Sequence, residues 1–431
     1  MSNEAESTNP TTANPAAATD DDMPSFNTDP VSDWTSDYDI FDREYVNDPV
    51  PVWNDLRGEC PIAHTDRWGG SWLPTKHADL QALAKMVPEL SSTDPLVVSL
   101  PDTAETQERD AAPEGLAAPP ITADPPLSEW TRRIILPTFA PKAVEGYRQY
   151  TETLCHELID GFIENGQCDA AQDYAQQIPP RVIAHLLGID PNKSDDFTTW
   201  VRGVLEFGLF DPKIRVKYRD IIQEFLVAEV SARAAEPRDD KLSEYLAMDI
   251  PEEFDRVRVV VGIANLLLIA GIDTTWSSIG SALFHFGSHP EDRHRLSADH
   301  DMFPTAIEEM LRYYSPVTMA RVALEDVEYN GVTFKEGDKV LMNFPGANHD
   351  PEVFEDADQI LIDRQRNRHI AFGSGIHRCA GSNLARLEMD VALRVWFERI
   401  PDFELSDPDS VTWAGGQVRG PRILPMRFLS N

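Results

Sequence analysis

The sequence has little cysteine, and its cysteines lie far apart. Four occur among 431 residues, at positions 60, 155, 168 and 379, and no two of them form a C-x-x-C pair. No metal-ribbon spacing can be built from them. Unpaired cysteines are typical of a reducing compartment, so the sequence predicts a cytoplasmic protein.

Positive charge is also scarce. Lysine and arginine number 38 against 73 aspartates and glutamates, which gives a net charge of −35 at pH 7. Nucleic-acid binding needs a basic surface that neutralises phosphates, so nucleic acid is excluded as an expected partner. The excess of acid instead indicates solubility or a saline environment.

Long apolar runs are absent as well. The most apolar stretch, Val259–Ile272, is interrupted by Asn265 and is too short to span a bilayer. The first 42 residues contain ten acidic residues and neither lysine nor arginine, so they lack both parts of a secretory signal. We therefore expect a disordered acidic tail over 1–37, one folded domain over 38–431, and no membrane contact.

Helical periodicity dominates the rest of the chain. It predicts helices over 127–138, 143–165, 178–187, 212–235, 254–286 and 305–314, and the one over 254–286 is the longest. Residues 62–64, 71–74 and 327–340 predict strands, the last with a turn at Asn330-Gly331. The segment 88–126 is too long for an ordinary connector and indicates a functional loop or lid. The fold class is therefore mainly α with a small β region.

The stretch from Phe372 to Gly381 carries the clearest chemical signal. It reads Phe-Gly-Ser-Gly-Ile-His-Arg-Cys-Ala-Gly, and the helical run 382–397 follows it. The positive end of a helix favours thiolate at Cys379. Thiolate is one of the few axial ligands that proteins offer to haem iron, and glycine lets the backbone approach a flat macrocycle. The alternative is a buried structural cysteine.

This stretch resembles the cysteine-ligand loop of the cytochrome P450 family. With four further motifs in the expected order, the resemblance extends from Tyr38 to Phe428 and points to the soluble bacterial type. It implies that 38–431 is a single catalytic domain, a triangular prism of about a dozen helices. It also implies haem b (iron protoporphyrin IX) bound through Cys379, with Phe372, Gly373 and Gly381 beside the cofactor.

The second motif is Ala270-Gly271-Ile272-Asp273-Thr274, inside the longest predicted helix. Small residues at 270 and 271 leave room for a ligand, and the Thr274 hydroxyl can compete for the Ala270 carbonyl. The family places this motif over the distal haem face, where an acid beside an alcohol suits proton delivery. The resemblance therefore assigns catalysis to Asp273 and Thr274. Without it, a buried helix with a polar patch is the better interpretation.

A third motif predicts a structural cluster. Glu309 and Arg312 are three residues apart, so they meet on one helical face. In the family the matching pair is buried and is joined by a later arginine, for which Arg364 fits. The implied role is to hold the loop that carries Cys379.

The fourth motif concerns the haem propionates. Asp124-Pro125-Pro126 opens a helix that contains Arg132, and the resemblance directs Arg132, Arg321 and His377 to the propionates as cations. Family members commonly have histidine where this chain has Ser128. We therefore expect one propionate contact to be weaker or replaced.

The last motif, 419–428, resembles the closing hairpin of the family, with 415–418 as a turn that reaches the substrate pocket. By resemblance, the pocket walls are Leu266, Leu267, Ala270, Val317, Thr318, Met319 and Val418. Most of these side chains are apolar, so we expect a hydrophobic substrate such as a terpenoid, steroid, fatty acid or alkyl aromatic.

The resemblance thus implies a haem-thiolate monooxygenase that inserts one atom of O2 into its substrate. No flavin or iron–sulfur segment is recognisable, so electrons are expected from a ferredoxin and its NAD(P)H-dependent reductase. Docking of an acidic ferredoxin needs basic residues on the cysteine side, and the candidates are Arg132, Arg133, Arg366, Arg368, Arg378 and Arg386. Two other interpretations remain: a hydrogen-peroxide-driven peroxygenase, disfavoured by the intact acid–alcohol pair, and a non-catalytic haem-binding sensor.

Overall fold

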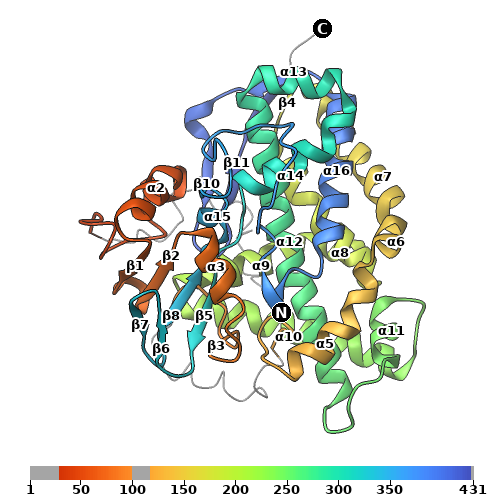
Figure 1. Ribbon diagram of the computed structural model, residues 1–431. Coiled ribbons are helices and arrows are strands. Elements are labelled where there is room, and N and C mark those ends of the chain that lie inside the picture. Colours follow the sequence, from red (N-terminus) through yellow and green to blue (C-terminus); the bar gives the residue numbers. More distant parts are fainter. Residues whose placement is uncertain (1–28, 100–116, 429–431) are drawn as a thin grey trace, which may run out of the picture.

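A single long helix, α12 (Arg256–Ser288), runs through the middle of the protein. The computed structural model describes residues 29–99 and 117–428. α12 begins after Asp255, whose side chain accepts a hydrogen bond from the Arg258 N–H, and most of its side chains are buried. It packs against α8 (Ile178–Leu187), α9 (Ser194–Leu205), α10 (Pro212–Ala235) and α16 (Ser382–Arg399). Figure 1 shows these helices around it.

The remaining helices are all much shorter than α12. In chain order they are α1 (Arg43–Asn47), α2 (Val50–Glu59), α3 (His77–Leu83), α5 (Leu127–Ile135), α6 (Pro141–Val144), α7 (Arg148–Asp160), α11 (Lys241–Ala247), α13 (Pro290–Ala298), α14 (Phe303–Tyr313) and α15 (Phe344–Ala347). Short 3₁₀ turns connect several of them.

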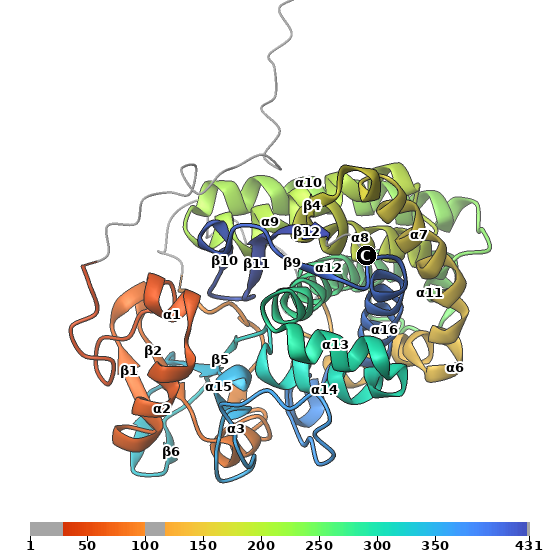
Figure 2. The same ribbon diagram turned by 90° about the horizontal axis from the view of Figure 1, so that it is seen from above.

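The strands form several small sheets. The largest sheet has the order β1-β2-β8-β5-β3, and the others are β4-β12-β9, β10-β11 and β6-β7. Their bounds are β1 (Ile62–Thr65), β2 (Ser71–Pro74), β3 (Leu90–Ser91), β4 (Gln167–Asp169), β5 (Met319–Ala323), β6 (Val327–Tyr329), β7 (Val332–Phe334), β8 (Lys339–Met342), β9 (Phe403–Leu405), β10 (Thr412–Ala414), β11 (Gly420–Ile423) and β12 (Pro425–Phe428). Seen from above, the large sheet with α1, α2 and α3 lies to one side of the helical body (Figure 2).

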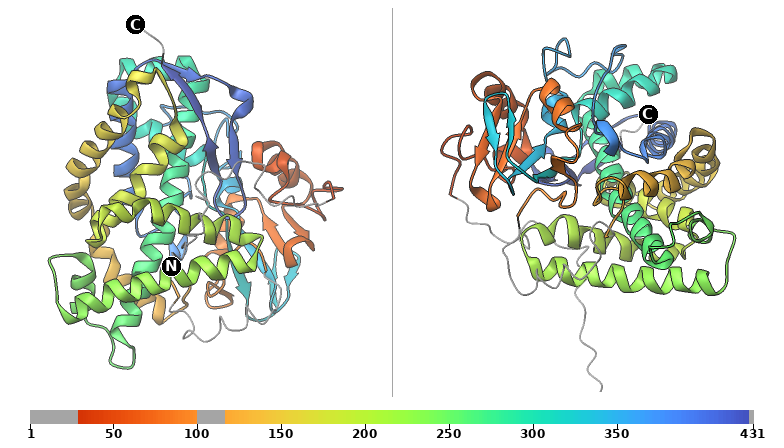
Figure 3. Two further views of the ribbon diagram at one scale, coloured as in Figure 1. Left: turned by 180° about the vertical axis from the view of Figure 1, so that it is seen from behind. Right: turned by 60° about the horizontal axis from the view of Figure 1, so that its bottom comes forward.

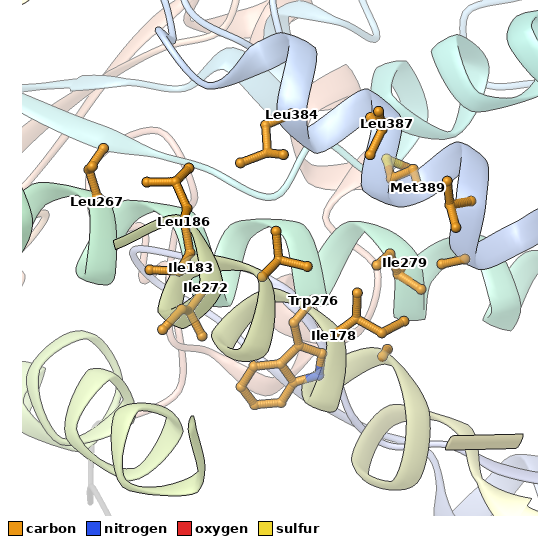
Figure 4. Close-up of a cluster of buried hydrophobic side chains, with 14 of the residues drawn as sticks. Ile178, Ile183, Leu186, Leu267, Ile272, Trp276, Ile279, Leu384, Leu387 and Met389 are labelled. Atoms are coloured by element: carbon orange, nitrogen blue, oxygen red, sulfur yellow. The ribbon is translucent and has the colours of Figure 1, made fainter. Parts of the chain in front are cut away.

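The main hydrophobic core lies where α8, α12 and α16 meet. Figure 4 shows part of it: Ile178, Ile183 and Leu186 from α8, Leu267, Ile272, Trp276 and Ile279 from α12, and Leu384, Leu387 and Met389 from α16. α9 and α10 cross another side of α12, as the rear view in Figure 3 shows. Burial of this apolar surface is the main source of stability for such a helical body.

Strongly periodic segments are where the prediction and the structure agree. The helices over 178–187 and 212–235 have the predicted bounds, and 254–286 corresponds to Arg256–Ser288. The Asn330-Gly331 turn joins β6 to β7 with positive φ at both residues. The predicted helices over 127–138 and 143–165 are shorter, because 3₁₀ turns replace their ends. Of the predicted loop 88–126, residues 100–116 lie outside the described residues.

The apolar run predicted to be too short for a membrane belongs to a longer helix. By length and composition α12 could cross a membrane, but 61% of its most apolar window is buried inside the protein, which is typical of a core helix. The helix continues beyond Ile272 to Ser288, in agreement with the predicted helix over 254–286.

The N-terminal segment contacts the body earlier than the predicted boundary at Tyr38. Arg67 Nε donates to Asp37 Oδ1 at 2.6 Å, and Arg67 Nη1 donates to the Asp29 carbonyl at 2.7 Å. Residues 1–28, most of the predicted tail, lie outside the described residues.

Candidate active site

Cys379 lies in the turn that precedes α16. The Cys379 N–H donates to the Phe372 carbonyl at 2.7 Å, which closes the loop between these two residues. Gly375 has a φ of +71°, and a Cβ there would lie 2.5 Å from the Ala84 carbonyl oxygen. Only glycine fits this position, since both its backbone angle and its surroundings exclude a side chain. The loop is thus held in one shape, and α16 begins at Ser382 as predicted.

The protein alone does not favour thiolate at Cys379, contrary to the prediction. Burial raises the pKa of the thiol, and the Gly381 N–H and the charges of Arg132, Arg378 and Arg386 only oppose this shift. A bound metal ion deprotonates a coordinating thiol outright, so the environment suits a cysteine that its metal ionises. Cys379 is nevertheless exposed to solvent.

Three nitrogen-bearing side chains gather near Cys379: Arg132 of α5, Arg321 of β5 and His377. Burial and the charges of Arg321 and Arg132 lower the pKa of His377 to about 3. Arg321 is 4% exposed. Its guanidinium donates to the Ala320 carbonyl and has no ion pair within the described residues. A buried cation without an anion is costly, so this cluster fits the dianionic haem propionates that the resemblance predicts.

Ser128 lies in α5, at the position where family members commonly have histidine. Its hydroxyl is buried and has no hydrogen-bond partner among the described residues. His377 is instead oriented by Ser92, whose Oγ lies 2.9 Å from His377 Nε2. Asp124 fixes this region, since it accepts from the Ser92 N–H at 3.0 Å and from Ser91 Oγ at 2.5 Å. Ser92 gave no sequence signal, because its partner lies 285 residues away.

The second motif lies in the middle of α12. Thr274 Oγ1 donates to the Ala270 carbonyl at 2.8 Å, as predicted, and the helix remains continuous there. Ala270 and Thr274 are half-buried on an otherwise buried helix. A Cβ on Gly271 would lie 2.8 Å from Ile183 Cδ1, so this glycine lets α8 pack closely. The room expected at Gly271 is therefore taken up by α8.

The Asp273 carboxylate lies in a buried ionic cluster. Arg422 Nη2 donates to both of its oxygens, at 2.9 and 3.2 Å, and Ser277 Oγ donates to Oδ1 at 3.2 Å. Arg422 Nε also donates to Glu206 Oε2 at 3.0 Å, and Arg202 donates to both Glu206 oxygens. The structure thus connects α12, α9 and β11 through charges that sequence spacing did not reveal.

Glu309, Arg312 and Arg364 meet as predicted. Arg312 Nε and Nη2 donate to the two Glu309 oxygens at 2.9 and 2.8 Å, and Arg364 Nε donates to Glu309 Oε2 at 3.0 Å. Arg312 also donates to the carbonyls of Asn348, Ala357 and Gln359. The cluster therefore fixes the chain between α15 and the Cys379 loop.

The predicted pocket walls come from α12, β5 and the segment before β11. Val317 pairs with Val418 in an isolated bridge, which brings two of these segments together. Leu267 belongs to the core cluster of Figure 4, and Thr318 lines a small cavity beside the N-terminal helices α1 and α2. The prediction that 419–428 forms one hairpin is wrong. β11 pairs with β10, and β12 pairs with β4 and β9. The turn at 415–418 joins β10 to β11.

Comparison with known proteins identifies the family. The family model of cytochrome P450 matches residues 210–410. The chain is 30% identical to the mycinamicin IV hydroxylase/epoxidase of Micromonospora griseorubida, over 83% of this chain and 89% of that protein. It is 32% identical to the vitamin D(3) 25-hydroxylase of Pseudonocardia autotrophica, over 86% and 91% of the two chains. A solved cytochrome P450 of Chondromyces apiculatus matches with a TM-score of 0.81 at 28% identity, over 93% and 100%.

The chain belongs to the cytochrome P450 family. It is an oxidoreductase of the monooxygenase type with a haem-thiolate iron cofactor, and its mainly α fold with small sheets is the fold of that family. The relatives include hydroxylases of bacterial origin.

Two of the basic residues expected to dock a redox partner of this cytochrome P450 are engaged internally. Arg386 Nε and Nη2 donate to Glu308 at 2.6 and 2.8 Å, and its guanidinium lies 4.4 Å from the centre of the Phe372 ring. Arg132 Nη2 donates to the Arg378 carbonyl at 2.5 Å. Arg133 and Arg378 are exposed, as are Arg366 and Arg368. The available charges are therefore fewer than predicted.

The cytochrome P450 also contains a clamp that the sequence did not reveal. Lys339 Nζ, on β8, donates to the carbonyls of Leu96 and Val98, both at 2.8 Å, and pairs with Asp94 at 2.9 Å. Gln417 Oε1 accepts from the Val97 N–H at 3.0 Å. These two buried side chains hold residues 94–98 against the turn that precedes Val418.

Proposed function

We propose that this cytochrome P450 binds haem b through Cys379 and hydroxylates a hydrophobic organic compound. The observation that carries the proposal is the arrangement around Cys379. A shaped glycine loop presents one accessible thiol, and a buried, unpaired Arg321 lies near it with Arg132 and His377. This set fits a metal macrocycle with anionic side groups.

Each residue around the cofactor has a distinct role in this proposal. Cys379 ligates the iron, while Arg132, Arg321 and His377 hold the propionates. Phe372, Gly373 and Gly381 allow close approach of the loop to the macrocycle. When bound, the thiolate-ligated haem supplies the oxygen-activating chemistry.

The residues of α12 supply protons. Monooxygenation consumes O2, two electrons and two protons, and it yields one hydroxylated product and one water. Thr274 lies half-buried on α12 with its hydroxyl tied to the Ala270 carbonyl. Asp273 precedes it and provides a titratable carboxyl. We propose that protons pass from Asp273 to Thr274 and then to the reacting oxygen.

The substrate is a hydrophobic compound that contacts Leu266, Ala270, Val317, Met319 and Val418. Printed names of relatives give mycinamicin IV and vitamin D(3) as their substrates. These names support a small organic compound over a nucleic acid or a peptide, and the vitamin D(3) name supports a steroid-like one. We propose a cytoplasmic enzyme whose electrons come from a ferredoxin and its NAD(P)H-dependent reductase.

The test is the absorption spectrum of the reduced protein with carbon monoxide. A thiolate-ligated haem is expected to give the strongly red-shifted Soret band of this family, and Cys379→His is expected to abolish that band while some haem stays bound. Cys60→His, at a half-buried cysteine away from the site, is the matched control and is expected to keep the band. An imidazole-type band in the unmodified protein would disprove the proposal.

A further inference from the structure

Three charged groups surround the proposed proton donor Asp273, namely Arg202, Glu206 and Arg422, and the two arginines are shared unequally between the two carboxylates. Glu206 accepts three hydrogen bonds from arginines: from Arg202 Nε at 3.1 Å, from Arg202 Nη2 at 2.7 Å and from Arg422 Nε at 3.0 Å. Asp273 is bonded by one arginine, Arg422, and by the Ser277 hydroxyl. The Glu206 carboxylate is thus paired with two arginines, whereas the Asp273 carboxylate is paired with one.

Because the arginines are shared unequally, the pKa values of Glu206 and Asp273 move in opposite directions. Burial would raise the pKa of Glu206, but the charges of Arg202 and Arg422 hold it at about 2. Burial raises the pKa of Asp273, Arg422 lowers it only in part, and the nearby Glu206 charge raises it further. Neighbouring acids whose environments move their pKa values apart are characteristic of sites where one acid exchanges protons.

We propose that Glu206 is a positioning residue that keeps Asp273 able to exchange protons, because it competes with Asp273 for Arg422. This inference rests on the proposed function, in which Asp273 supplies protons. The charged and titratable groups that face Asp273 are Arg202 of α9, Glu206 directly after α9, and Arg422 of β11.

The geometry of Arg422 explains the competition. Its Nε bonds to Glu206, its Nη2 to Asp273 and its Nη1 to Ser277 Oγ at 3.1 Å, so one guanidinium joins the three groups. When Asp273 takes up a proton, Arg422 keeps Glu206 as its anion. Without Glu206, protonation of Asp273 would leave two buried guanidiniums with no carboxylate, which is strongly unfavourable. Glu206 therefore lowers the cost of protonating Asp273.

The ring of Trp276 also contacts the Arg422 guanidinium that the two carboxylates share. The Arg422 guanidinium lies 4.2 Å from the centre of this ring, so Arg422 is held in position between α12 and α9. Gly420 and Gly280 let β11 approach α12, since a Cβ on Gly420 would lie 2.3 Å from Ser277 Cβ. Arg422 thus cannot easily move to follow one carboxylate, and the two acids must share it in place.

The experiment compares Glu206→Gln with the unmodified holoenzyme by infrared spectroscopy in the resting ferric state. The absorption of the protonated carboxyl of Asp273 is assigned by its loss in Asp273→Asn. We expect the Glu206→Gln titration midpoint to fall by about one pH unit or more, which is about a tenfold loss of proton affinity. Glu206→Asp keeps the charge and is expected to lie between the two. A midpoint that is unchanged or raised in Glu206→Gln would overturn the inference.

Asp240→Asn is the matched control. Asp240 is also a buried acid, bonded to Arg233 at 2.9 Å, but it belongs to the contact between α10 and α11. The Asp240→Asn variant is expected to leave the pH midpoint of the Asp273 titration unchanged. If Glu206→Gln does not retain haem, Arg202→Met replaces it: Arg422 then becomes the sole arginine partner of Glu206, so the Asp273 midpoint is expected to rise. A lower or equal midpoint there contradicts the competition.

A second measurement separates this inference from the proposed function. With electrons from a ferredoxin and its reductase, the share of consumed NAD(P)H recovered as hydrogen peroxide is measured for each variant without added substrate. Asp273→Asn and Glu206→Gln are both expected to raise this share. No change in Asp273→Asn overturns the proton-donor role and the inference with it. A rise in Asp273→Asn with none in Glu206→Gln overturns the inference alone.

Discussion

The two buried ionic clusters of this cytochrome P450 differ in how fully their carboxylates are supplied with donors. Glu309 accepts five hydrogen bonds, from Arg312 Nε and Nη2, Arg364 Nε, the Leu361 N–H and Asn367 Nδ2. Within residues 29–99 and 117–428, Asp273 is bonded by Arg422 and Ser277 alone. Both carboxylates are almost fully buried. The number and charge of their donors therefore separate them, rather than their depth.

The difference shows in the pKa values. Burial would raise the pKa of Glu309, but Arg312, the Leu361 N–H and Arg364 lower it below its ordinary value. The pKa of Asp273 is raised, since burial outweighs its donors. A carboxylate with a full set of donors stays ionised and holds chain segments in place, whereas one with few donors can gain and lose a proton. The first arrangement suits a frame and the second suits proton transfer.

The largest expected effect tests the frame. Arg312→Met leaves the Glu309 carboxylate with Arg364 alone among the arginines and removes donors from three carbonyls. Breaking a buried ion pair on one side costs about 3–5 kcal/mol. We expect a large loss of thermal stability and of bound haem, measured by thermal unfolding and by haem absorbance per protein.

Arg394→Met is the control for this prediction. Arg394 pairs with Asp390 at 2.7 Å on the partly exposed face of α16. Such pairs contribute about 0–1 kcal/mol, so haem content and unfolding are expected to change little. Equal losses in the two variants would show that the buried cluster has no special role in the frame.

The sequence predicted the frame better than the proton site, and the reason is the distance between partners. Glu309 and Arg312 are one helical turn apart, so spacing alone brings them together. Arg422 lies 149 residues from Asp273, and 216 from Glu206. No periodicity links such positions. Only packing of β11 against α12 brings them into contact, and the same holds for Lys339 and Leu96, which are 243 residues apart.

The pKa of Cys379 could not be predicted for a related reason. A helix N-terminus is visible in sequence, and it favours thiolate. How densely the protein surrounds the sulfur is a property of the whole fold, and here this desolvation outweighs the N–H of Gly381 and three arginines. Ser128 illustrates the same point, because sequence alone did not show that its hydroxyl is buried without a hydrogen-bond partner among the described residues.

A carboxyl with still fewer donors extends the comparison. Glu388 of α16 is 1% exposed, and its Oε2 has no hydrogen-bond partner among the described residues. Burial raises its pKa well above 4.5. Between pH 4.5 and its raised pKa, the folded state binds a proton that the unfolded state releases, so this group makes stability fall as pH rises. The slope is about 1.4 kcal/mol per pH unit.

Glu388→Gln is expected to remove this slope. The variant should gain stability relative to the unmodified protein as pH rises above 4.5, and the two should converge at lower pH. Denaturant unfolding at several pH values measures this difference. Glu398→Gln, on an exposed position of the same helix, is the control and is expected to leave the slope unchanged. A parallel pH dependence in Glu388→Gln would show that water or movement relieves the carboxyl.

The smallest expected effect concerns the surface rather than a buried cluster. Arg386 is bonded to Glu308, so its reversal would disturb the Cys379 loop as well as the surface charge. Arg133 is exposed on α5 and has no ion pair with a described residue, so Arg133→Glu changes the charge alone. If a ferredoxin docks there, reduction of the haem is expected to slow by about three- to tenfold at low salt, with a weaker dependence on salt. Arg43→Glu, at an exposed position of α1, makes the same change in net charge and is expected to leave the rate unchanged. Stopped-flow reduction at several salt concentrations measures both variants.

The two variants change the net charge equally, so only local docking at Arg133 can make their rates differ. Equal rates for Arg133→Glu and Arg43→Glu at low salt would therefore show that the electron donor binds elsewhere.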